Sequence, residues 1–219
     1  MAMTIPHAAA LAGVPSGVQA QGPWAGRRQL FVRFAGEAET ATMYTASALA
    51  GELKKLSTRS VYHSICVGGR DVLANAEFLA AALDEWPPPI PVMLDVDGQR
   101  PEELRQLEGR FVLVQVTHEF TPAAGVLDRT LETLRTAAAL EAVHALVLAP
   151  GEDTTDGQVM RAVEGAHAAS GGTIIVVHPP PGADPTMLDR RWGTLLEQAT
   201  RLHADVRLSV RIPPPVGLR

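Results

Sequence analysis

Residues 111–149 read FVLVQVTHEFTPAAGVLDRTLETLRTAAALEAVHALVLA. The two ends of this stretch, 111–117 and 143–149, are nearly continuous apolar runs, which is typical of strands covered on both faces. The segment between them, 126–140, has apolar residues at helical spacing. A strand, a crossover helix and a second strand of this kind predict a right-handed βαβ unit with parallel strands.

The rest of the chain repeats this alternation in both directions. We expect further strands over 29–34, 61–66, 91–96, 173–178 and 205–212, and helices over 42–56, 75–86, 101–107, 154–169 and 185–203. Asn75, and either Thr154 or Thr155, have side chains suited to capping two of these helices. Roughly six or seven βα units are too few for a closed eight-stranded barrel. The pattern therefore predicts an α/β protein with a parallel sheet, either doubly wound or a partial, open barrel.

Composition narrows the classes of protein that the chain represents. It has 219 residues, one cysteine and a net charge of −5. One cysteine excludes an intramolecular disulfide and an iron–sulfur cluster held by the chain's own thiolates, and a reducing cytoplasm is the expected location. The acidic balance argues against nucleic-acid binding, and no apolar run is long enough to span a membrane. We expect residues 1–18 to be a poorly ordered lead-in and residues 19–219 to form a single domain.

Five segments match one family in order along the chain: VQAQGPWAGRRQLFVRFAG (18–36), CVGGRDVLANAEFLAAAL (66–83), MLDVDGQRPEEL (93–104), TIIVVHP (173–179) and VRLSVRIPPPVGLR (206–219). Together they resemble the 7-carboxy-7-deazaguanine synthases, a radical S-adenosylmethionine (SAM) family of the 7-deazapurine pathway. The resemblance implies a partial, open (β/α)6 barrel of the radical SAM type, similar to a TIM barrel. It selects the open barrel from the two architectures above.

The chain departs from this family where the family binds its cofactors. At the three positions of the family's cluster cysteines stand Glu37, Ala41 and Tyr44. These side chains cannot replace three soft thiolate ligands, so we expect no [4Fe–4S] cluster and no reductive cleavage of SAM. The family's glutamate beside the SAM amino group is Arg70 here, and its substrate-binding Gln-x-His-Lys is replaced at 211–214.

Candidate site residues lie where the expected strands end, because barrels of this type carry function at the carboxyl ends of their strands. The candidate acid–base residues are His118, Glu119, His178 and Glu37. The candidate ligand-binding residues are Gly68, Gly69, Arg70, Asp95, Asp97, Gln19 and Arg33, of which Gln19, Arg33 and the two glycines are those that the resemblance retains. A purely structural role is the alternative to a functional one for these residues: a tight turn for the glycines, an ion pair for Arg33, and ordinary core positions for the histidines. No metal site is expected.

Two functions follow from these observations. The first is a pseudoenzyme with the radical SAM fold, which binds SAM or a 7-deazapurine-like ligand in a 7-deazapurine or nucleoside pathway. Alternatively, instead of binding such a ligand, it would scaffold a partner in that pathway. The resemblance implies a homodimer, and a heterodimer with an active relative is the variant of it. The second is a repurposed enzyme that uses the old barrel cavity, with or without SAM, for non-radical transfer, cyclisation or elimination.

Overall fold

The structure of the chain is a computed structural model that describes residues 8–180 and 190–209. The strands are β1 (Ala8–Gly13), β2 (Ser16–Val18), β3 (Arg28–Phe34), β4 (Thr42–Thr45), β5 (Ser64–Gly69), β6 (Val92–Val96), β7 (Leu113–Glu119), β8 (Val143–Ala149), β9 (Ile174–Val177) and β10 (Val206–Leu208). The helices are α1 (Ala46–Arg59), α2 (Ala76–Glu85), α3 (Val126–Ala139), α4 (Asp156–Ala169) and α5 (Arg190–Leu202), with short 3-10 helices η1 (Val72–Asn75) and η2 (Glu103–Leu107).

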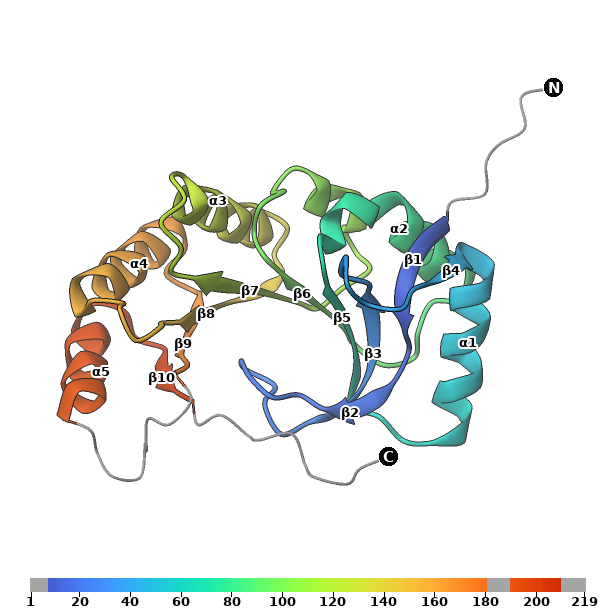
Figure 1. The fold of residues 1–219 in the computed structure, drawn as a ribbon, viewed down its shortest axis with the longest axis horizontal. Helices are drawn as coiled ribbons and strands as arrows, with labels where there is room; N and C mark the ends of the chain where they lie inside the picture. Colours follow the sequence, from blue (N-terminus) through green and yellow to red (C-terminus); the bar gives the residue numbers. More distant parts are fainter. Residues whose placement is uncertain (1–7, 181–189, 210–219) are drawn as a thin grey trace.

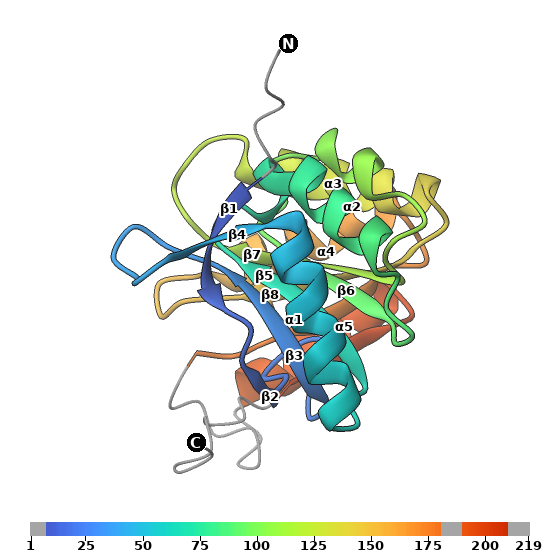
Figure 2. The ribbon, with the colours of Figure 1, turned by 90° about the vertical axis from the view of Figure 1, so that its right-hand side faces the viewer.

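The described strands form one curved, open sheet (Figure 1). Their order is β10-β9-β8-β7-β6-β5-β3-β1-β4, and β2 also pairs with β3. The strands from β3 to β10 along this order run parallel, whereas β1 is antiparallel to both of its neighbours. The helices lie on the convex side of the arc, and the turn after β2 lies on the concave side (Figures 1 and 2). The predicted α/β class with a parallel sheet is thus confirmed.

The βαβ unit expected over 111–149 is present as β7, α3 and β8. Strand alternation along β7 places Val114 and Val116 in the main core under the helices. It places Leu113 on the concave side, in a smaller cluster with Cys66 and Met93. The sheet therefore has a thick apolar core behind it and a second surface, partly apolar and partly polar, inside the arc.

The amino-terminal region differs from the expected lead-in. Residues 8–13 and 16–18 form β1 and β2, which extend the sheet beyond its parallel part. The helix expected from residue 42 begins at Ala46, because the segment Thr42–Thr45, which has two β-branched threonines and a tyrosine, pairs with β1 as β4. The Thr45 hydroxyl caps α1 by accepting from the Ala48 amide at 3.1 Å.

The two expected helix caps have different outcomes. Thr155 caps α4 and forms a full capping box with Gln158. Asn75 does not cap α2; its amide donates to the Asp71 carbonyl at 3.3 Å, because the 3-10 turn η1 precedes the helix there. Residues 185–189 and 210–212, expected to belong to a helix and a strand, lie outside the described residues.

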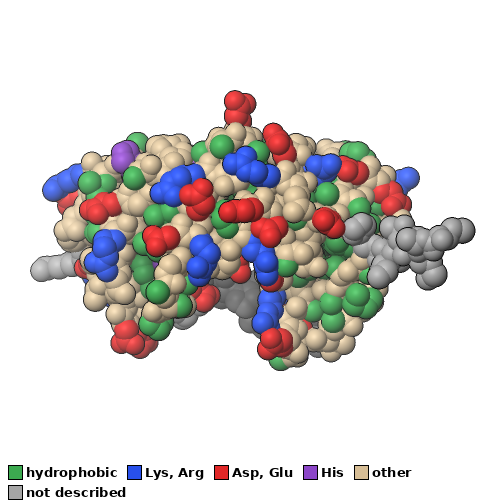
Figure 3. Space-filling view, turned by 90° about the horizontal axis from the view of Figure 1, so that it is seen from above, with side chains coloured by type: hydrophobic (Ala, Val, Ile, Leu, Met, Phe, Trp, Pro, Cys, Tyr) green, Lys and Arg blue, Asp and Glu red, His purple; other side chains and the backbone are tan. Residues whose placement is uncertain are grey.

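The solvent side of the helices carries acidic and basic side chains side by side (Figure 3). Exposed ion pairs such as Arg135–Glu132 at 2.7 Å account for part of this pattern. Pairs of this kind contribute little stability each. Among the described helices, none is long and apolar enough to cross a membrane.

Candidate functional site

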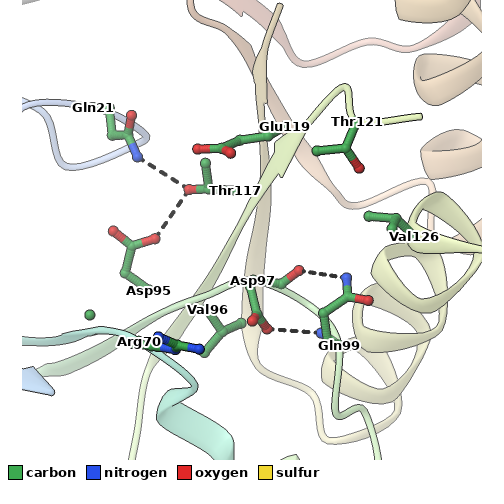
Figure 4. Close-up of a pocket in the computed structure, with 11 residues that line it drawn as sticks. Gln21, Arg70, Asp95, Val96, Asp97, Gln99, Thr117, Glu119, Thr121 and Val126 are labelled. Atoms are coloured by element: carbon green, nitrogen blue, oxygen red, sulfur yellow. Dashed lines mark hydrogen bonds between the residues drawn. The ribbon is translucent and has the colours of Figure 1, made fainter. Parts of the chain in front are cut away.

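A pocket of about 720 Å³ opens at the carboxyl ends of β5, β6 and β7, on the concave side of the sheet (Figure 4). Parallel strands end together at one edge, so side chains far apart in sequence meet there. The pocket is lined by Gln21, Gly69, Arg70, Asp95, Val96, Asp97, Gln99, Thr117, Glu119, Thr121 and Val126.

Asp95 is fixed in the pocket by a chain of two hydrogen bonds. The Thr117 hydroxyl donates to Asp95 Oδ1 at 3.2 Å, and Gln21 Nε2 donates to the Thr117 hydroxyl at 3.2 Å (Figure 4). The register of the sheet explains the first bond: Asp95 pairs with Gln115 on β7, and Thr117 is the next residue on the same face. The carboxyl group is therefore held in one place by groups from β7 and from the turn after β2.

The surroundings of Asp95 change its acidity. Burial raises the pKa of Asp95 from 3.8 to about 6, while the side chains of Gln115 and Thr117 oppose this rise. Desolvation disfavours the charged form, and here it outweighs the polar contacts. A carboxyl group with this pKa exchanges protons close to neutral pH, which is the property that a general acid–base group needs.

The turn over 19–27 closes the pocket from the concave side. Backbone hydrogen bonds hold it, with Gln19 N donating to Arg27 O at 2.9 Å and Gly26 N donating to Gln19 O at 2.8 Å. Gly22 lies directly against Gln115: a Cβ at Gly22 would be 1.6 Å from the amide oxygen. The turn can carry Gln21 to Thr117 only because residue 22 has no side chain.

The outer rim of the pocket is polar and charged. Asp97 Oδ1 accepts from the Gln99 amide at 3.0 Å, and Arg129 Nε donates to Gln99 Oε1 at 2.6 Å. Arg70 Nη2 pairs with Glu37 at 2.7 Å, and this ion pair lowers the pKa of the Glu37 carboxyl. Glu119, exposed, lies two residues beyond Thr117 on the same face of β7.

The structure brings together five of the residues that the sequence predicts for the site. These are Gly69, Arg70, Asp95, Asp97 and Glu119. The lining residues that the sequence analysis missed include Gln21, Gln99 and Thr117. Strand alternation could have predicted that Thr117 lines the pocket, because it lies two residues before Glu119 on the same face. The position of Gln21 depends on a turn that no local sequence pattern predicts.

Two predicted acid–base residues lie elsewhere. His118 is buried on the helix side of β7, where its Nδ1 lies 3.5 Å from the Thr130 hydroxyl and its ring packs edge-on against Phe120. Burial lowers the pKa of His118, which favours the neutral ring. His178 is buried at the end of β9 and does not line the pocket. The one-residue alternation of the strand turns His118 away, because Thr117 and Glu119 already face the ligand side.

The remaining predicted residues stand beside the pocket without lining it. A Cβ at Gly68 would lie 3.5 Å from the Cβ of Asp95. Arg33 is bound by Glu39 at 2.8 Å, and Glu37 reaches the pocket only through Arg70. Gln19 is buried within the 19–27 turn. Within residues 8–180 and 190–209, no three His, Cys, Asp or Glu side chains are grouped to hold a metal ion.

Cys66 lies in the apolar cluster on the concave face of the sheet. Burial, and then the charge of Asp95, raises the pKa of its thiol well above the usual range. We therefore predict that iodoacetamide alkylates Cys66 at least about 100-fold more slowly in the folded protein than in the urea-unfolded chain, because the thiolate is the reactive form. Mass spectrometry of the time course measures both rates, and similar rates in the two states would contradict the predicted burial.

Comparison with known proteins places the chain in no family. No protein-family model matches it, and no curated protein matches it. Among solved structures, the apo form of the 3-keto-D-glucoside 4-epimerase of E. coli is similar over 76% of this chain and 88% of the epimerase chain. The sequence identity is 15% and the TM-score 0.32, a likeness from which no activity is inferred.

The resemblance to the 7-carboxy-7-deazaguanine synthases is wrong. No protein-family model matches the chain, and the radical SAM family models are among those that do not match. The segments that carry the resemblance include ordinary strands, turns and helices: 18–36 spans the turn before β3 together with β3, and 66–83 spans most of β5, η1 and most of α2. Glycines and apolar runs serve the same structural purpose in any α/β sheet. The pseudoenzyme function, the repurposed radical SAM cavity and the 7-deazapurine pathway are withdrawn with it.

Proposed function

We propose that the chain is a small-molecule enzyme in which Asp95 transfers a proton to or from a polar ligand bound in the pocket. The observation that carries this proposal is the position of Asp95, whose carboxyl group lies in a 720 Å³ pocket and is held by Thr117. Its pKa of about 6 lets it act both as an acid and as a base near neutral pH.

The architecture supports the same proposal. We take the curved sheet to be a partial barrel similar to a TIM barrel, in which ligands bind at the carboxyl ends of the strands. The pocket occupies that end of β5, β6 and β7, and its volume is within the range of small-molecule sites. Thr117 and Gln21 are positioning residues here, because they orient the carboxyl group and fix which of its oxygens faces the ligand.

The test follows the carboxyl group of Asp95 directly. In protein labelled with 13C at the aspartate carboxyls, we expect one resonance that titrates near 6 and is missing in the Asp95→Asn variant. A panel of sugars, amino sugars and amino acids is then added, and a ligand of the pocket shifts this resonance and raises the melting temperature.

The matched control is Asp84→Asn, an exposed aspartate at the opposite end of the sheet that pairs with Arg110 at 2.7 Å. It is expected to bind the same panel members as the wild type, whereas Asp95→Asn loses at least about tenfold in affinity. A titration of Asp95 at its ordinary value, together with a panel that leaves its resonance unmoved, would refute the proposed function.

A further inference from the structure

We infer that the ligand of this pocket is a hydroxylated primary amine, of the amino-sugar class, bound in its ammonium form. This inference rests on the proposed function and adds the chemical class of the ligand. Its basis is the balance of charge around the pocket, where, among the residues that the structure describes, the lining has three carboxylates, of Asp95, Asp97 and Glu119, and one cation, Arg70.

Arg70 does not supply a free positive charge for an anionic ligand. Its guanidinium is paired with Glu37 at 2.7 Å, and Arg100 beside it is bound by both oxygens of Asp71, at 2.6 and 3.0 Å. The remaining nearby cation, Arg129, donates to Gln99 at the rim. Carboxylates outnumber guanidiniums in this group of described residues: Glu37, Asp71, Asp95, Asp97 and Glu119 against Arg70, Arg100 and Arg129.

A surplus of negative charge selects a cation and repels an anion of the same shape. The effect is strongest in the recess next to Asp95, where the lower dielectric leaves charges less screened. Phosphates and carboxylic acids are therefore poor ligands for this pocket, and an ammonium group meets carboxylate acceptors on β6 and β7.

The kind of cation follows from the absence of aromatic rings among the described lining residues. Quaternary ammonium ions are recognised by aromatic faces, which this pocket does not offer. A primary ammonium instead donates three hydrogen bonds, and carboxylates are its natural acceptors. We therefore assign the cationic group to a primary amine.

The rest of the lining fits hydroxyl groups. Gln21 and Gln99 offer amide groups that both donate and accept, and Thr117 and Thr121 add hydroxyls. Figure 4 shows these side chains, which come from the turn after β2, from β7 and the loop after it, and from the loop after β6. Groups that both donate and accept complement a ring of hydroxyls better than they complement an apolar body.

The experiment uses three sugars of one size that differ in charge: D-glucosamine, D-glucose and D-glucuronate, with choline as the quaternary amine. At about pH 7 we expect glucosamine to bind at least about tenfold more tightly than glucose, and glucuronate and choline to bind more weakly than glucose. Bound glucosamine also lowers the pKa of Asp95 in the 13C titration, because a nearby cation favours the carboxylate.

Glu119→Gln is expected to weaken glucosamine binding about fivefold, whereas Glu164→Gln, on the exposed side of α4, leaves it unchanged. Equal binding of the three sugars, preference for glucuronate, or no binding of glucosamine would each overturn the amine assignment. The first two outcomes leave the proposed function standing when the sugars shift the Asp95 resonance. Failure of the proposed function is seen separately, as an Asp95 that titrates normally and responds to no member of the panel.

Discussion

The Asp95→Asn variant is expected to be more stable than the wild type by about 3 kcal/mol at about pH 8, and equally stable at about pH 3. The cause is the rise in the pKa of Asp95 from 3.8 to about 6 when the chain folds. The ionised carboxylate is disfavoured in the folded state, and asparagine, which has nearly the same shape, carries no such charge.

The sign of this effect follows from proton binding. Between the unfolded pKa of 3.8 and the folded pKa of about 6, the folded state binds more protons than the unfolded state, so stability falls as the pH rises. Below this window both states are protonated and the substitution changes little. Above it the full penalty is present in the wild type and absent in Asp95→Asn.

Urea unfolding of both proteins across this pH range measures the difference between their free energies of unfolding. Taking this difference removes the contribution of all other titrating groups, because both proteins share them. A difference that does not depend on pH, or a variant less stable than the wild type at about pH 8, would contradict the raised pKa of Asp95.

The expected result also bears on function, because the chain has a destabilising carboxyl group at a position where asparagine would be more stable. Such a cost is common where a side chain takes part in chemistry.

Gly69→Ala is expected to destabilise the protein by about 3 kcal/mol or more. Gly69 ends β5 with a φ of +104°, a conformation that side chains disfavour. A Cβ there would lie 2.3 Å from the carbonyl oxygen and 2.8 Å from the amide nitrogen of Phe34. Both contacts are with the backbone of β3, so no side-chain rotation can relieve them.

Gly51→Ala is the matched control for this experiment. Gly51 is exposed within α1, and nothing lies within 4 Å of the position where its Cβ would be. Alanine is the better helix former, so this variant is expected to gain about 0.5–1 kcal/mol. Chemical denaturation of both variants gives the two signs, and a Gly69→Ala protein as stable as the wild type would show that β5 and β3 do not approach this closely.

Much of the fold is predictable from the sequence because the buried parallel strands are continuous apolar runs. The βαβ unit from β7 to β8 is the clearest case, since both strands are covered on both faces and need no polar alternation. The strands β1 and β2 are missed because they consist mainly of small residues, and β4 (Thr-Met-Tyr-Thr) is missed because it begins a segment with apolar residues at helical spacing. Their pairing is a tertiary effect that local preference does not contain, because β1 and β2 pair with β3 and β4 pairs with β1.

The candidate site is likewise predictable from the sequence only in part. Asp95, Asp97 and Glu119 are predictable from strand ends, because parallel strands finish at one edge. His118 is misplaced by one residue of strand alternation, which depends on whether Thr117 or its neighbour faces the concave side. Gln21 is beyond local analysis, since its position depends on a turn that packs Gly22 against Gln115.

The hydrogen bond from Gln21 to Thr117 joins residues 96 positions apart in the sequence. Contacts of this separation form only after a long loop has closed, and chains that depend on them fold slowly. The pocket is therefore complete only in chains in which the amino-terminal turn has reached β7. A ligand of the pocket therefore binds only chains in which the amino-terminal turn contacts β7, and its binding stabilises the folded state alone.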